Sequence, residues 1–136
     1  MRTKLGVLAA GLGVFCLAVP VVAHHSFASE YDAKKKVSLT GVVAKVEWTN
    51  PHMRVYVDVT DEKGVVTHWN LELTSPNTVR RQGWGKNDLN AGDKVTFEGY
   101  AGKVVESRAS LLSISKVGDG RPLFVQGGPG AADNPQ

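Results

Sequence analysis

Hydrophobic and polar residues alternate along much of the chain, and this two-residue period is typical of β-strands with one buried face. The first such segment covers residues 37–48 and contains Gly41, which predicts a long strand that bends or bulges at the glycine. The dipeptide Asn50-Pro51 then ends it with a turn. Further strands are expected over residues 53–59, 65–73, 95–101 and 109–117, with a short edge strand over 122–125.

The second and third segments are expected to form a hairpin whose register follows from their connection. Gly64 suits the left-handed last position of a three-residue loop over 62–64, which places Asp61 opposite Val65. One face of the hairpin is then almost wholly apolar, and a slip of one residue would mix the two faces. The expected cross-strand pairs are Val59 with Thr67, Val57 with Trp69, Val55 with Leu71 and Met53 with Leu73 on the apolar face, and Arg54 with Glu72 and Asp58 with His68 on the polar face.

A short helix is expected over residues 76–82. Ser75 is a good N-cap, Pro76 suits the first helical position, and Gly83 suits the left-handed position after the last turn. Three strands, a short helix and two more strands are the element order of the five-stranded Greek-key barrel called the OB-fold. The sequence therefore predicts a mainly β protein, a small OB-like barrel with one short helix between strands three and four, and a rolled sandwich is the alternative.

The first residues are typical of an export signal. Arg2 and Lys4 give a basic start, residues 5–19 are apolar, and residues 21–23 supply a small-residue cleavage site. Cleavage after Ala23 makes His24 the mature N-terminus, and it predicts a periplasmic or secreted protein without a membrane span. A retained anchor is the alternative because residues 5–23 approach the roughly 20 residues that span a bilayer, although three glycines and Pro20 weaken it.

The 136 residues suffice for one modest domain, and 42% hydrophobic residues predict a packed core. We expect a signal peptide over 1–23, an N-terminal segment over 24–36, the barrel over 37–125 and a disordered tail over 126–136. The single Cys16 leaves with the signal peptide, so a disulfide is not expected. Without Arg2 and Lys4, 14 basic residues remain against 13 acidic ones, and this near-neutral charge argues against a nucleic-acid partner.

Four histidines, His24, His25, His52 and His68, carry the candidate chemistry, since histidine is a common ligand of zinc and copper. His68 is interpreted as the structural partner of Asp58, about 20 Å along the sheet from His52. His52 is expected opposite Thr74, where two polar turns converge at one end of the barrel. The residues expected to form a ligand mouth there are Trp48, Asn50, Ser75, Asn77, Arg80 and Arg81, with the arginines attracting an anion. Turn capping and complementation of the helix C-terminus are the alternatives for these residues.

Processing would create a possible metal site. The amine and ring of His24, with the ring of His25 or His52, offer three nitrogen ligands, a set that suits Cu(II) and less selectively Zn(II) or Ni(II). Asn50 or Asn77 would orient these ligands. The N-terminal histidine resembles the copper-binding start of lytic polysaccharide monooxygenases, a resemblance of one residue that carries over no activity. A frayed N-terminus is the alternative.

Five short motifs together resemble one family. They are His24-His25-Ser26-Phe27-Ala28, Trp48-Thr49-Asn50-Pro51-His52, Ser75-Pro76-Asn77, Arg81-Gln82-Gly83-Trp84 and Gly92-Asp93-Lys94-Val95. The chain resembles an uncharacterised family of small exported bacterial proteins marked by a His-His-Ser-Phe start and a Trp-x-Asn-Pro-His motif. This resemblance extends to Phe124 and implies periplasmic residence and an OB-like barrel, with no established activity. The family's turn after the fourth strand is a variant here, over residues 102–107.

No sequence motif for thiol, zinc-protease, phosphate-loop or serine-hydrolase chemistry is present, so a catalytic role is not expected. We expect a periplasmic binding module whose ligand is a metal ion, copper above all, or another small ligand. The alternative is an accessory protein that docks on another periplasmic protein, such as a redox enzyme, without metal. A copper oxidase or a hydrolase is a third, weaker hypothesis.

Overall fold

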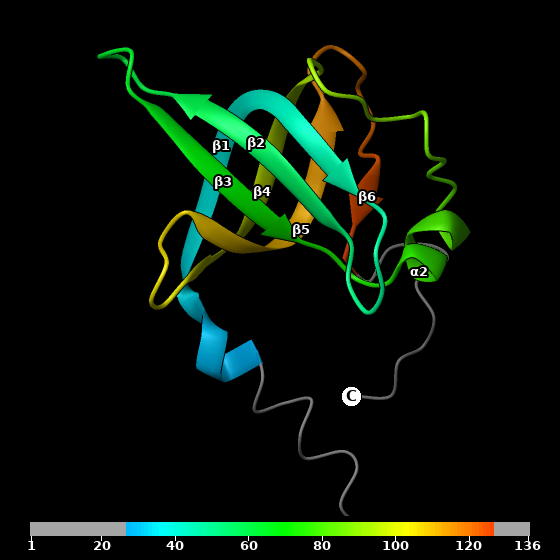
Figure 1. The fold of residues 1–136 in the computed structure, drawn as a ribbon, viewed down its shortest axis with the longest axis horizontal. Coiled ribbons are helices and arrows are strands. Elements are labelled where there is room, and N and C mark those ends of the chain that lie inside the picture. The colour runs from blue at the N-terminus through cyan, green and yellow to red at the C-terminus, as the bar shows by residue number, and fades with distance from the viewer. Residues whose placement is uncertain (1–26, 127–136) are drawn as a thin grey trace, which may run out of the picture. The chain divides into compact units, whose positions relative to one another are not determined.

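The computed structural model describes residues 27–126. The chain divides into two compact units, Met1–Glu30 and Tyr31–Gln136, and the described part of the first is a helical turn over 27–30. The second unit contains all the strands found within residues 27–126 (Figure 1). Its elements are β1 (Tyr31–Glu47), β2 (Arg54–Thr60), β3 (Val66–Glu72), α2 (Pro76–Arg81), β4 (Lys94–Gly102), β5 (Arg108–Lys116) and β6 (Phe124–Val125).

The strands close into a barrel. Hydrogen bonding joins them in the order β3-β2-β1-β4-β5-β6, and a further parallel pairing between β3 and β5 connects the two sides of the sheet. Five strands therefore follow one another around the barrel as β1-β2-β3-β5-β4, with α2 between β3 and β4 in the chain and β6 beside β5. This is the OB topology, and the predicted fold class is confirmed.

Strand β1 is longer than its hydrophobic pattern predicts. It begins at Tyr31, whereas the alternation predicts a strand that begins at residue 37. Residues 32–36 are polar or alanine and show no apolar alternation. The pairing with β4 nevertheless extends the strand, with Tyr31 opposite Gly102 and, after a shift of register, continuous pairing from Lys36 to Val42. The last part of β1 then pairs with β2, and Figure 1 shows the strand curving from one partner to the other.

Neither register shift of β1 lies at Gly41, where a bend or bulge is predicted, and the first of them, against β4, falls between Tyr31 and Lys36. The β1–β2 register shifts between Val43 and Lys45, which is a bulge at Ala44. Gly41 has a different role, because a Cβ atom there would lie 2.5 Å from the backbone oxygen of Asp58. Glycine thus allows β1 to pass close to β2.

The hairpin of β2 and β3 has the predicted register. Val55 pairs with Leu71, Val57 with Trp69, and Val59 with Thr67. Its connection also agrees, since Gly64 has φ +82° and the backbone of Asp61 donates to the oxygen of Val65 over 2.9 Å. The inward side chains join one core with those of the other strands and α2. The largest fully buried ones are Phe97, Phe124, Met53, Leu71, Leu111 and Ile114.

Helix α2 is capped at both ends by the predicted residues. Oγ of Ser75 accepts a hydrogen bond from the backbone of Thr78 over 3.4 Å. After the last turn, Gly83 has φ +90°, and the backbone N–H groups of Gly83 and Trp84 donate to Arg80 and Val79, which is the Schellman arrangement. Trp84 is thereby turned into the core, where it is 2% exposed.

Several predictions concern residues beyond the described range. The signal peptide, His24, His25 and nearly all of the C-terminal tail lie outside residues 27–126. Within that range, no helix has both the length and the apolar character needed to cross a bilayer. The edge strand is shorter than predicted, because β6 begins at Phe124 and leaves Pro122, which lacks a backbone donor, in the preceding turn.

Candidate functional site

The carboxylate of Glu72, at the end of β3, gathers donors from three other strands. Its Oε2 atom accepts hydrogen bonds from the Tyr31 hydroxyl over 2.8 Å, from Nη2 of Arg54 over 3.0 Å and from Nη2 of Arg108 over 2.7 Å. Charge-assisted bonds of this kind are about twice as strong as neutral ones. We refer to Tyr31, His52, Arg54, Glu72 and Arg108 as the Glu72 site.

Strand pairing explains why these residues meet. Arg54 stands opposite Glu72 in the β2–β3 hairpin. Arg108 begins β5, whose parallel pairing with β3 places it opposite Asn70, two residues before Glu72. Tyr31 begins β1 and is 4% exposed, and its ring lies 5.5 Å from the guanidinium of Arg108. The site is therefore built on rigid strands at the seam that closes the barrel.

Burial and charge oppose each other at Glu72, whose side chain is 14% exposed. Burial alone would raise the pKa of this carboxyl group. The hydrogen bonds from Arg108 and Tyr31, together with the charge of Arg54, outweigh burial and hold the pKa below its ordinary value. Glu72 is consequently ionised at neutral pH, and two guanidinium groups face its single negative charge.

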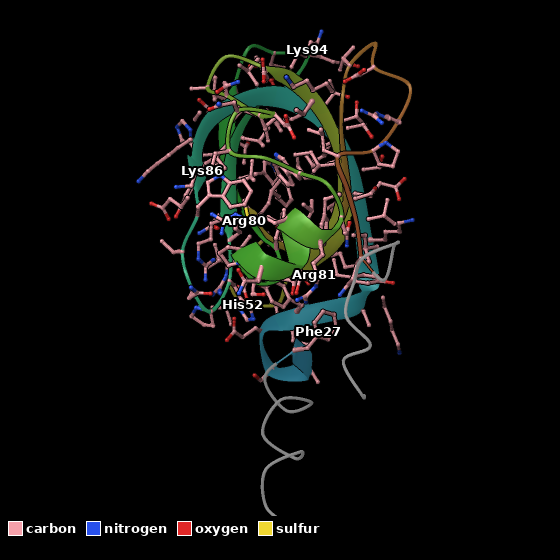
Figure 2. All side chains as sticks on the ribbon, turned by 90° about the vertical axis from the view of Figure 1, so that its right-hand side faces the viewer. Phe27, His52, Arg80, Arg81, Lys86 and Lys94 are labelled. Atoms are coloured by element: carbon pink, nitrogen blue, oxygen red, sulfur yellow. The ribbon has the colours of Figure 1, made fainter. Side chains whose placement is uncertain are left out.

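His52 contacts the other oxygen of the same carboxylate. Its Nδ1 atom lies 2.8 Å from Oε1 of Glu72, and its side chain is 48% exposed. The loop that carries it is held at both ends, because the hydroxyl of Thr49 donates to the His52 oxygen over 3.1 Å and the backbone of Met53 donates to Thr74 over 3.0 Å. Figure 2 shows His52 at the end of the barrel where α2 lies.

Several of the residues predicted to form a ligand mouth also make contacts within the fold. Ser75 caps α2. The guanidinium of Arg80 lies 5.4 Å from the ring centroid of Trp48, and Nη2 of Arg81 donates to the hydroxyl of Thr78 over 3.1 Å. Both arginines project from α2 (Figure 2). A cation resting on an aromatic ring stabilises the loop before His52.

A second aromatic contact supports Trp48. Its ring meets that of Trp84 edge to face, with centroids 5.8 Å apart and an angle of 71° between the planes. Asn50 and Asn77 are exposed, and within residues 27–126 the side chain of His52 contacts Glu72. The role predicted for either asparagine in orienting metal ligands stays a prediction.

The predicted structural pair on the polar face of the hairpin is present. Nδ1 of His68 lies 2.6 Å from Oδ1 of Asp58, and these side chains are 80% and 39% exposed. His68 thus has a carboxylate partner, as His52 does. This pair is exposed to solvent, and in the part of the chain that the structure describes no arginine is bonded to its carboxylate. This makes it a matched control for His52.

The described residues contain no cluster of three or more His, Cys, Asp or Glu side chains able to hold a metal. Of the three predicted metal ligands, His52 lies within residues 27–126, and His24 and His25 lie outside them. Four members of the Glu72 site, Tyr31, Arg54, Glu72 and Arg108, were not predicted as site residues. The sequence contained one signal for Glu72. His52 is expected opposite Thr74, and Glu72 is two residues before Thr74, so His52 and Glu72 are diagonal neighbours across the two strands. Diagonal pairs are within reach of long side chains.

The fold and the site together define a structural class, which is a small OB barrel with a charged cluster where β3 and β5 pair to close it. Within that class the chain belongs to DUF6152, a family of unknown function whose model matches residues 10–110. No curated protein matches the chain.

Solved structures with a similar fold are single-stranded DNA-binding proteins and a PriB domain. The mitochondrial protein Rim1 of S. cerevisiae is 10% identical with a TM-score of 0.46, covering 61% of this chain and 94% of its own. The N-terminal domain of PriB from Thermoanaerobacter tencongensis is 14% identical with a TM-score of 0.44, covering 61% and 96%. A small single-stranded DNA-binding protein of Streptomyces coelicolor is 15% identical with a TM-score of 0.40, covering 60% and 89%.

Proposed function

We propose that this protein is an exported, non-catalytic binding module of the periplasm that takes up a copper ion, with the imidazole of His52 as one ligand. The observation that supports this proposal is the contact between Nδ1 of His52 and Oε1 of Glu72, at 2.8 Å. Histidines that bind metals usually direct their second ring nitrogen to a carboxylate or a backbone oxygen.

The carboxylate also decides which nitrogen of His52 is available. An ionised Glu72 favours a proton on Nδ1, which leaves the lone pair on Nε2 of a half-exposed ring. Glu72 is itself held by Tyr31, Arg54 and Arg108, so the imidazole has a fixed support. Such support lowers the ordering cost of metal binding.

The remaining ligands in this proposal come from the N-terminal histidines. Cleavage after Ala23 would give His24 a free amine, and this amine, the His24 ring and the ring of His25 would add nitrogen donors that suit Cu(II).

The first test uses protein exported and processed by a bacterial host. Native mass spectrometry, before and after addition of Cu(II) and then a chelator, reports the N-terminus and the bound metal together. We expect a chain that starts at His24 and retains one copper. A correctly cleaved chain that takes up no copper would overturn the proposal, and docking on another periplasmic protein would become the leading candidate.

A pair of variants tests the role of His52. His52→Ala should weaken copper binding by about tenfold or more, because it removes one ligand. His68→Ala removes an imidazole that also contacts a carboxylate but lies elsewhere on the hairpin, and it should leave the affinity unchanged. Equal losses from the two substitutions would contradict the proposed geometry.

We also propose that nucleic acid is not the partner, although similar structures are named as single-stranded DNA-binding proteins. Single-stranded nucleic acid requires a basic groove with stacking aromatic side chains. Here Lys36, Lys45 and Lys116 each pair with a carboxylate. Fluorescence anisotropy of a labelled oligothymidine should show no saturable binding at physiological salt, and salt-dependent saturable binding would contradict this statement.

A further inference from the structure

A second concave site on the barrel is lined by residues other than those of the Glu72 site. It is a groove of about 470 Å³ between the first half of β1, strand β3 and the loop that joins β4 to β5. This volume lies within the usual range of small-ligand pockets. One of its lining residues, Ser107, directly precedes Arg108 of the Glu72 site in the chain.

The floor of the groove is apolar. Val37 and Leu39 of β1 are half-buried, Trp69 of β3 is 9% exposed, and Ala101 of β4 is fully buried. We refer to these four residues as the groove floor. Val37, Leu39 and Trp69 are not completely buried, and all three line the groove. An apolar ligand that covered them would remove apolar surface from water, which favours binding.

A single cation stands at one end of this floor among the residues that line the groove. Lys35, Val37 and Leu39 occupy alternate positions of β1 and all line the groove. At about 3.3 Å per residue, Lys35 and Leu39 are about 13 Å apart along the strand. The groove therefore offers an elongated apolar surface that ends in an ammonium group.

The lysine has a partner that is easily replaced. Nζ of Lys35 lies 2.6 Å from Oε1 of Glu106, and these side chains are 47% and 78% exposed. Exposed ion pairs contribute little to stability. Glu106 belongs to the β4–β5 loop, next to Val105, which is 56% exposed. A carboxylate on a ligand lying over the floor could take the place of the Glu106 carboxylate without leaving a buried charge.

We propose that this groove binds a small amphipathic acid, with an apolar body on the groove floor and one carboxylate that replaces Glu106 as the partner of Lys35. A medium-chain fatty acid has this chemistry: an unbranched apolar body for the floor and a single negative head for the ammonium group. Lys35 is the one cation among the groove's lining residues and Glu106 is the one anion, so the ligand's carboxylate gains the ammonium group as its partner by displacing the carboxylate of Glu106.

The test uses nitrogen-15-labelled processed protein and decanoate, kept below the concentration at which decanoate forms micelles. Nuclear magnetic resonance follows the indole N–H signals of Trp48, Trp69 and Trp84. The signal of Trp69 should shift saturably, whereas those of Trp48 and Trp84, which do not line the groove, should stay nearly constant. No saturable shift of Trp69, or equal shifts of all three, would overturn the proposal.

Three variants test the head group. Lys35→Met should weaken decanoate binding by about tenfold, the effect of losing one charge-assisted hydrogen bond, and should leave decanol binding unchanged. Lys36→Met is the matched control, because the neighbouring Lys36 pairs with Glu98 and does not line the groove. Glu106→Gln removes the competing carboxylate and should strengthen decanoate binding.

Two results would count against an acidic ligand. If Lys35→Met and Lys36→Met have the same effect on decanoate, the proposed role of Lys35 is wrong. If the Trp69 signal instead shifts with protein concentration in the absence of decanoate, the groove is a contact between two copies of the chain. Copper uptake measured on the same samples should be unaffected by Lys35→Met, which separates this proposal from the metal site.

Discussion

Glu72 and Arg108 are joined across the parallel pairing that closes the barrel, with Nη2 of Arg108 2.7 Å from Oε2 of Glu72. The two residues belong to strands β3 and β5, which pair over three residues each. Such a short pairing supplies few backbone hydrogen bonds. The ion pair therefore adds a side-chain connection at the place where the barrel has the least backbone pairing, and it joins barrel closure to the candidate site.

Replacing Glu72 by glutamine should destabilise the fold. The substitution keeps the shape of the side chain but leaves Arg54 and Arg108, which are 26% and 32% exposed, without their anion. We expect the free energy of unfolding to fall by about 2 kcal/mol, below the 3–5 kcal/mol typical of fully buried pairs, because these arginines retain some contact with water. Urea denaturation followed by tryptophan fluorescence measures the change.

The control is Asp58→Asn, which removes the carboxylate of an exposed pair in the same hairpin. It should change the free energy of unfolding by about 0.5 kcal/mol or less. If Glu72→Gln were as harmless as Asp58→Asn, the Glu72 site would not stabilise the closing seam.

A second prediction concerns metal binding by the same Glu72→Gln variant. An amide cannot replace the charge that favours a proton on Nδ1 of His52, so copper affinity should fall by about 10–100-fold, the usual effect of losing a residue that orients a ligand. Competition against a chelator of known affinity measures it, at a temperature where the variant is folded. An unchanged affinity would mean that Glu72 does not orient a metal ligand.

The hairpin was predictable because its determinants are close together in the sequence. The valines at alternate positions determine which face of the hairpin is buried, and Gly64 sets the length of the loop between β2 and β3. A shift of one residue would move every apolar side chain to the solvent face. The helix ends were predictable for the same reason, since Ser75 and Gly83 act on neighbouring backbone groups.

The Glu72 site was predictable only in part. The pairing of Arg54 with Glu72 follows from the hairpin register, but Arg108 and Tyr31 are 36 and 41 residues from Glu72 in the sequence. They reach it because β3 pairs with β5 and because β1 begins earlier than its alternation indicates. Alternation reports which face of a strand is buried, and it does not report which distant strand lies beside it.

The third prediction is a pH dependence at Asp93, whose Oδ2 accepts a hydrogen bond from the backbone of Asn90 over 2.8 Å and lies 3.0 Å from Nζ of Lys116. The Asn90 N–H and then Lys116 hold the pKa of this carboxyl group below its ordinary value. A lowered pKa stabilises the fold above the unfolded value of about 4, and this contribution is lost as the pH falls through the folded pKa.

Asp93→Asn should therefore lower the free energy of unfolding at pH 7 by about 1 kcal/mol or less, since the side chain is partly exposed. The difference between the two proteins should shrink steadily below about pH 4. Urea denaturation at pH 7, 5, 4 and 3 measures it. A difference that stayed constant over this range would show that the charge of Asp93 does not contribute.

The last prediction concerns the close approach of β1 to β2 at Gly41. A Cβ atom at this position would lie 2.5 Å from the backbone oxygen of Asp58 and 2.7 Å from Cγ1 of Val57. The oxygen belongs to a paired strand and cannot rotate away, so Gly41→Ala must displace the backbone of one strand. We expect a loss of about 1–3 kcal/mol in the free energy of unfolding, the usual cost of overpacking a core.

Gly85→Ala is the matched control, because the nearest atom to a Cβ there is Oδ2 of Asp88 at 3.6 Å, an ordinary contact. It should change the free energy of unfolding by about 0.5 kcal/mol or less. The change should be a slight gain in stability if alanine reduces the conformational freedom of the unfolded chain. Equal stability of Gly41→Ala and Gly85→Ala would mean that β1 does not pass so near β2. A selective loss at Gly41 would instead show that the glycine is required where β1 changes its partner from β4 to β2, the step that allows one strand to serve both sides of the barrel.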